Sequence, residues 1–175
     1  DPQIAGAAWK TTPDSSAAED ALLQNPNAGA PKQATALANP ADYFELTFNA
    51  DAGKPYRLWI RSKALNDSYN NDSVFVQFDQ SLDASGTAAW RIGTTSATSV
   101  ILENCGGCGV QGWGWSDNGY ETMGPVITFA QSGPQRLRIQ VREDGLGIDQ
   151  VVLSAVRYFT NAPGATKNDT TIVPR

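Results

Sequence analysis

The chain has 175 residues, a formal net charge of -5 and no histidine. This length suits one domain with a core of its own, and 13 lysines and arginines against 18 aspartates and glutamates, with no basic run, argue against a nucleic-acid partner. The lack of histidine excludes Ser-His-Asp and Cys-His catalysis, and two cysteines cannot build a four-sulfur metal site. No apolar run approaches the roughly 20 residues that span a bilayer, so we expect no membrane insertion.

Residues 11–41 are rich in Ala, Pro, Asn and Ser, and only Leu22 and Leu23 are adjacent large apolar residues. We expect this segment to be largely loop, with at most one short strand or turn. After it, apolar and polar residues alternate, and turn-forming residues recur about every ten positions. This pattern predicts strands at residues 43–48, 56–62, 73–79, 88–93, 98–103, 125–130, 136–142 and 148–154.

The alternation is clear in residues 56–62, where Tyr56, Leu58 and Ile60 share one side and Arg57, Trp59 and Arg61 share the other. We expect the first side to face the core and the second to face water. Short strands without helical patterns between them predict an all-β fold, an antiparallel β-sandwich or jelly roll. Residues 1–159 are expected to form a single domain, and residues 160–175, which lack periodicity, a C-terminal tail or linker.

The segment ENCGGCGVQGWGWSDNGY, residues 103–120, holds both cysteines and six glycines. Its glycines favour a loop over a strand. The spacing of Cys105 and Cys108 fits either a small structural disulfide or a redox pair. A redox pair usually opens a helix, and this glycine-rich stretch is a poor helix start, so we predict a disulfide that stiffens the loop in an oxidising compartment.

The same loop carries aromatic and polar residues in the combination that sugars require. Sugar C-H groups stack on aromatic rings while hydroxyl groups need hydrogen-bonding partners. A ligand site is therefore predicted around Trp113, Trp115, Asp117, Asn118 and Tyr120, with a second polar run at Asn70, Asn71 and Asp72. The alternatives are that the tryptophans cap the end of the core and that the second run is a solvated turn.

Three stretches together resemble a known group of proteins: PYRLWIRSKALNDSYNNDSVFVQF (55–78), the loop at 103–120, and VREDGLGIDQVVLS (141–154). They are similar to carbohydrate-binding modules of families six and thirty-five, which are galactose-binding-like β-sandwiches appended to secreted bacterial enzymes. The resemblance implies a non-catalytic domain that is secreted or displayed on the cell surface. It also implies a polysaccharide or glycan as partner and a place in a larger multidomain protein.

The resemblance further implies a structural calcium ion. The aspartate that helps to bind it matches Asp149, and its N-terminal partners would come from Glu19, Asp20 or Asp14. Calcium prefers six to eight oxygen ligands, which carboxylates and backbone carbonyls supply. The chain departs from the pattern at Gly147, where family members often carry a ligand-binding asparagine.

Two further functions stay open on the sequence. One is a structural or adhesion domain of a bacterial surface protein, in which the tryptophans contact a neighbouring domain or protomer. The other is a small polysaccharide lyase or glycosidase that acts through carboxylates, Tyr or Arg. The sequence places no two carboxylates in one cleft, so we expect no enzymatic activity.

Overall fold

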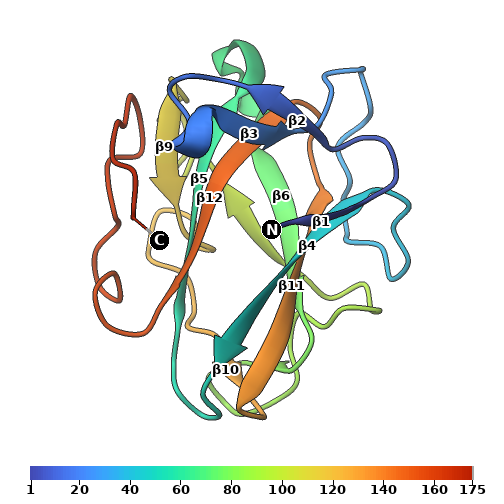
Figure 1. The fold of residues 1–175 in the computed structure, drawn as a ribbon, viewed down its shortest axis with the longest axis vertical. Helices are drawn as coiled ribbons and strands as arrows, with labels where there is room; N and C mark the ends of the chain where they lie inside the picture. Colours follow the sequence, from blue (N-terminus) through green and yellow to red (C-terminus); the bar gives the residue numbers. More distant parts are fainter. Residues whose placement is uncertain (175) are drawn as a thin grey trace.

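The computed structural model describes residues 1–174, which form two five-stranded antiparallel sheets packed face to face (Figure 1). The first sheet has the order β1-β4-β11-β6-β8 and the second the order β2-β3-β12-β5-β9. The first comprises Gln3–Ala5, Tyr43–Ala50, Gly133–Val141, Ser73–Phe78 and Thr98–Ile101 in that order. The second comprises Lys10–Pro13, Ala21–Gln24, Leu146–Ser154, Arg57–Ala64 and Trp113–Ser116. A small pair, β7 (Ser81–Leu82) and β10 (Thr128–Phe129), completes the strands.

The core lies between the two sheets and is filled by the residues that alternate along the strands. Both inner faces contribute, because every second side chain of a strand points to the same side. The largest members with almost no exposed surface include Phe44, Leu58, Ile60, Phe78, Phe129, Leu137 and Ile139. The predicted antiparallel β-sandwich is confirmed.

Seven of the eight predicted strands overlap strands of the structure. The exception is 88–93, which has no strand; Trp90 has φ 50°, a left-handed conformation that interrupts an extended segment. The predicted strand 125–130 shortens to Thr128–Phe129. Residues 113–116, expected in a loop, form β9 instead, paired with β5.

The N-terminal region holds more structure than one short strand. Strands β2 and β3 form a hairpin around the 3₁₀ turn Ala18–Asp20. β3 pairs with β12 at Gly147 and Ile148 only. Residues 25–41 contain no strand or helix, so the expectation of a largely loop segment holds for the second half of 11–41. Within residues 1–174, no helix has both the length and the apolar character needed to traverse a bilayer.

Residues 155–174, here called the C-terminal segment, lie against the second sheet (Figure 1). The amide of Trp115 donates to Ala165 O at 2.9 Å, and the amide of Asp169 donates to Trp113 O at 2.9 Å. The segment therefore pairs with the outer edge of β9. A Cβ atom on Gly114 would lie 2.0 Å from the carbonyl oxygen of Thr166, so the contact requires glycine there. Residues 165–169, which lie beyond the expected domain boundary at residue 159, thus contact the sheet.

Candidate functional site

The loop between β8 and β9 is closed by a disulfide between Cys105 and Cys108, whose Cα atoms are 5.5 Å apart. The amide of Cys108 also donates to Cys105 O at 3.2 Å. The Glu103 carboxylate accepts from the amide of Gly109 at 2.6 Å, and Asp67 accepts from that of Gly112 at 2.8 Å. The loop is thus held by its own cross-link and by two carboxylates.

Trp113 and Trp115 are buried, with 5% and 0% of their surface exposed. Because both lie on β9, their side chains share one face of the sheet and stand beside Lys63 and Arg61 in the register. The Arg61 guanidinium lies 4.5 Å from the centroid of the Trp113 ring. The expectation that these rings form an exposed platform is wrong, because neighbouring chain segments cover them.

Two segments provide that cover. The indole N–H of Trp113 donates to Ser16 Oγ at 2.9 Å, from the N-terminal region. The indole N–H of Trp115 donates to Thr171 O at 3.2 Å, from the C-terminal segment. Both polar atoms of the rings are therefore satisfied inside the domain, as buried Trp side chains require.

The second polar run lies at the same end of the sandwich as the disulfide loop, and two of its members are buried. Asn71 donates from Nδ2 to Leu65 O at 3.0 Å, and Asp72 accepts from the amide of Glu103 at 2.8 Å. Asn71 and Asp72 thus hold loops together and are not available to a ligand. Asn70 remains exposed.

Asp72 and Glu143 form a buried carboxyl pair. Burial, followed by the hydrogen bond with Glu143, raises the pKa of Asp72 to about 7. Burial also acts to raise the pKa of Glu143, but hydrogen bonds with Asp72, Lys32 and Ser73 outweigh it and lower that pKa. The Lys32 ammonium lies 2.6 Å from the Glu143 carboxylate. The pair therefore holds its proton on Asp72 and its charge on Glu143.

This pair predicts a pH dependence of stability. The pKa of Asp72 is raised in the folded state, so the protonated carboxyl group contributes to the free energy of unfolding. This contribution is complete below the unfolded-state pKa of 3.8 and is lost as the pH rises to about 7. Asp72→Asn keeps a donor for Glu143 and needs no proton. Relative to wild type, we expect the free energy of unfolding of the variant to increase between pH 4 and 7, by on the order of a few kcal/mol. The difference should then stay constant above pH 7. Urea unfolding at each pH measures it.

Asp83→Asn is the matched control, because Asp83 lies in an exposed turn and its pKa is lowered, first by its hydrogen bond with Ser85. Its substitution should leave the pH profile above pH 5 unchanged. Parallel profiles for wild type and Asp72→Asn would show that the pair does not share a proton in this way.

A pocket of about 200 Å³ opens between residues 117–123 and the C-terminal segment. Trp59 and Trp115 are among its lining residues, although little of either side chain is accessible. The remaining walls are mostly polar or small: Asn104, Asp117, Gly119, Glu121, Thr122, Met123, Ala162 and Thr166. The pocket therefore offers hydrogen-bonding groups from two separate parts of the chain.

The predicted residues of this loop divide into structural and accessible ones. Asp117 accepts from the amides of Gly119 and Gly124 at 2.9 and 2.8 Å, and Asn118 donates to Pro125 O at 3.2 Å. Both side chains shape the loop, although Asp117 also lines the pocket. Tyr120 is 47% exposed and stands in sequence between the lining residues Gly119 and Glu121. Tyr120 is thus the accessible aromatic ring of the predicted set.

The expected calcium ligands do not converge. Asp149 is buried and accepts from Arg61 at 2.5 Å and from the amide of Ala18 at 2.7 Å. Glu19 and Asp20 lie on the surface. Asp14 is paired with Lys63; that hydrogen bond is the main cause that lowers the pKa of Asp14 to about 2.

Among the side chains of residues 1–174, no three acidic or cysteine groups gather as a metal site would require. One oxygen of Asp149, Oδ2, is already engaged by the Arg61 guanidinium and the amide of Ala18. As arranged here, these residues do not fit a calcium ion.

Sequence reasoning did not find four residues that matter here: Trp59, Arg61, Glu121 and Asp169. The alternation correctly placed Arg61 and Trp59 on the outer side of β5, which was expected to face water. It could not reveal the distant chain segments that bury that side. No local pattern marks Asp169, which lies 108 positions from the arginine that it meets.

No family model matches the chain, and no curated protein matches it in sequence. Among solved structures, a family 35 carbohydrate binding module from Clostridium thermocellum aligns with a TM-score of 0.43 at 9% identity. The alignment covers 88% of this chain and 92% of that one. That module belongs to one of the two families that the sequence motifs resemble. At this similarity the match assigns a role to no residue.

Proposed function

We propose that this domain binds a carbohydrate at the pocket beside Tyr120 and that it is not an enzyme. The observation that carries the proposal is an exposed tyrosine whose chain neighbours Gly119 and Glu121 line a small pocket, with Asn104, Asp117 and Thr122 as further polar lining residues. A tyrosine ring offers a stacking face for sugar C-H groups, and amide, carboxylate and hydroxyl groups offer partners for sugar hydroxyls.

The rigidity of the loop supports this function. The Cys105–Cys108 disulfide follows the lining residue Asn104, and the two amide hydrogen bonds to Asp117 order the backbone at the lining residue Gly119. A site that is already ordered loses less entropy when a ligand binds. This matters for sugars, because the solvated hydroxyls of the ligand must first lose water.

The number of available carboxylates in the pocket supports sugar binding without hydrolysis. A glycosidase needs two carboxyl groups placed across the scissile bond. Asp117 is tied to two amides and lies 3.8 Å from the Arg57 guanidinium, so its lone pairs are largely committed. Glu121 is then the single carboxylate of the pocket that remains available.

The test compares Tyr120→Ala with wild type on an immobilised panel of plant, algal and microbial polysaccharides, with and without calcium. We expect retention of the wild type on at least one glycan, and a loss of about three- to ten-fold in affinity in the variant, as for the removal of one aromatic contact. Tyr69→Ala is the matched control, because Tyr69 is exposed on a different loop. Equal loss in both variants, or no retention at all, would contradict the proposal.

A second function, contact with another protein domain, is favoured by the exposed apolar side chains of Met123 and Val156. In that case the chain should show no response to the glycan panel and should self-associate as its concentration rises. We place the domain in a secreted or cell-surface protein, as part of a larger multidomain chain. The disulfide supports this location, because such bonds persist in oxidising compartments.

A further inference from the structure

We propose that Arg61 is the structural cation of this domain: its guanidinium lies among the oxygen atoms of Asp149, Asp169 and Ser16, and the fold therefore needs no metal ion. The resemblance noted above gives this role to calcium. The structure assigns it to a side chain of β5.

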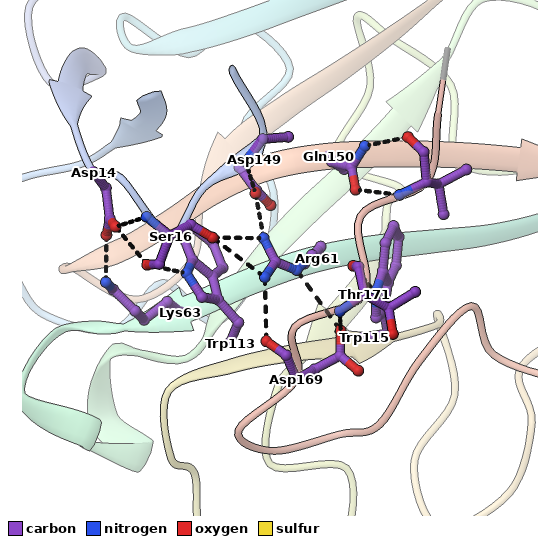
Figure 2. A network of polar contacts seen from close by, with 12 residues as sticks. Asp14, Ser16, Arg61, Lys63, Trp113, Trp115, Asp149, Gln150, Asp169 and Thr171 are labelled. Atoms are coloured by element: carbon purple, nitrogen blue, oxygen red, sulfur yellow. Dashed lines mark hydrogen bonds and ion pairs between the residues drawn. The ribbon is translucent and has the colours of Figure 1, made fainter. Parts of the chain in front are cut away.

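Beside the Trp113 ring, the polar contacts of Arg61 are with oxygen atoms (Figure 2). Nη1 donates to the Asp149 carboxylate at 2.5 Å, and Nη2 donates to Asp169 O at 3.2 Å. Both terminal nitrogens lie 3.5 Å from Ser16 O, and Nε lies 3.8 Å from the Asp169 carboxylate. Carboxylate and carbonyl oxygens of this kind are the ligands that calcium also takes.

The site is closed to solvent, with side-chain exposures of 1% for Arg61, 0% for Asp149 and 5% for Asp169. A charge in such a place is tolerated only when it is paired and hydrogen-bonded. Backbone amides add further hydrogen bonds: Ala18 donates to Oδ2 of Asp149, and Ala165 and Thr171 donate to the Asp169 carboxylate. The planar guanidinium can reach several oxygens at once, which an ammonium group cannot do in the same way.

Arg61 connects separate parts of the chain, as a structural metal ion does. Ser16 belongs to the N-terminal region, Asp149 to the last strand and Asp169 to the C-terminal segment, and Arg61 joins all three to β5. One oxygen of Asp149, Oδ1, is buried without a hydrogen-bond partner in residues 1–174. This is the atom that a metal ion would contact if the inference were wrong, so metal binding is the decisive measurement.

The experiment uses the purified wild-type chain and the variant Arg61→Met, which keeps an unbranched side chain but removes the guanidinium and its charge. Metal content by mass spectrometry is expected to be well below one ion per wild-type chain. The melting temperature of the wild type is expected to be the same in excess EDTA and in excess calcium. Arg61→Met should melt about 10 °C lower, because it leaves two buried carboxylates without their cation.

Arg136→Met is the matched control, since Arg136 is half exposed and pairs with Asp79 and Glu45 at the surface. Its melting temperature should change by no more than about 3 °C. Stabilisation by calcium in Arg61→Met alone would show that guanidinium and ion compete for the same oxygens. One calcium ion per wild-type chain, with a fall in its melting temperature in EDTA, would overturn the inference even if Arg61→Met does not fold.

Discussion

Asp169→Ala is expected to lower the free energy of unfolding by about 3–5 kcal/mol, the usual cost of removing one partner from a buried ion pair. The substitution removes the carboxylate beside the Arg61 guanidinium. It also leaves the amides of Ala165 and Thr171, which donate to that carboxylate at 2.7 and 2.8 Å, without an acceptor. Urea unfolding followed by fluorescence measures the loss, with the slope of the transition as a check on cooperativity.

Asp51→Ala provides the comparison, because Asp51 pairs with Lys54 in a solvent-exposed ion pair at 3.1 Å. Such pairs contribute about 0–1 kcal/mol. An Asp169 variant within that small range would mean that the C-terminal segment is not anchored through this carboxylate. It would also weaken the role given to Arg61.

Trp115→Ala is the second substitution with a large expected effect, again about 3–5 kcal/mol of stability. The ring is fully buried between the sheet and the C-terminal segment, and its N–H bonds Thr171 O. Truncation opens a cavity and removes the ring that fixes this part of the segment. Thermal unfolding followed by circular dichroism gives the change, with Tyr120→Ala, at an exposed position, expected to stay close to wild type.

The expected destabilisation by Trp115→Ala determines which variant can test glycan binding. A Trp115 variant that loses a glycan after losing its fold says nothing about the ligand surface, whereas a folded Tyr120 variant does. If Trp115→Ala keeps the wild-type melting temperature and still loses a ligand, then the ring belongs to the binding surface and the covered arrangement is not the one that binds.

The sequence predicted the core because the core depends on local alternation. In β5, Leu58 and Ile60 lie on the inner face as their spacing indicates, and in β11 Leu137 and Ile139 do the same. Antiparallel strands of this length leave few folds other than a sandwich. The cysteine pair was also predictable, since its spacing and its glycines left few alternatives.

What the sequence could not reveal was the cover over the second sheet. Arg57, Trp59 and Arg61 alternate with the core residues and were expected to face water, yet all three are buried. Their cover comes from the C-terminal segment, and nothing in the periodicity of β5 records a partner so far along the chain. Trp115 was expected at a ligand surface for the same reason, and the cover of Trp113 by the N-terminal region was equally absent from the local pattern.

The candidate site was predictable only in its location. The loop at 103–120 and the polar run at 70–72 do meet at one end of the sandwich, through the bond from the amide of Glu103 to Asp72. Which side chains stay accessible depends on hydrogen bonds that the sequence does not display. Asp72 is taken up by Glu143 and a backbone amide, whereas Tyr120 is left open.

The pairing of the C-terminal segment with β9 also has a consequence for solubility. Sheet edges with free amides and carbonyls are templates on which other chains add strands, and proteins commonly protect them. Residues 165–169 occupy the edge of β9 through the bonds to Trp113 and Trp115. A fragment that stops at residue 159 would expose this edge together with the Trp115 indole ring, and both features favour aggregation. Residues 160–174 are thus expected to protect the domain from aggregation as well as to stabilise its fold.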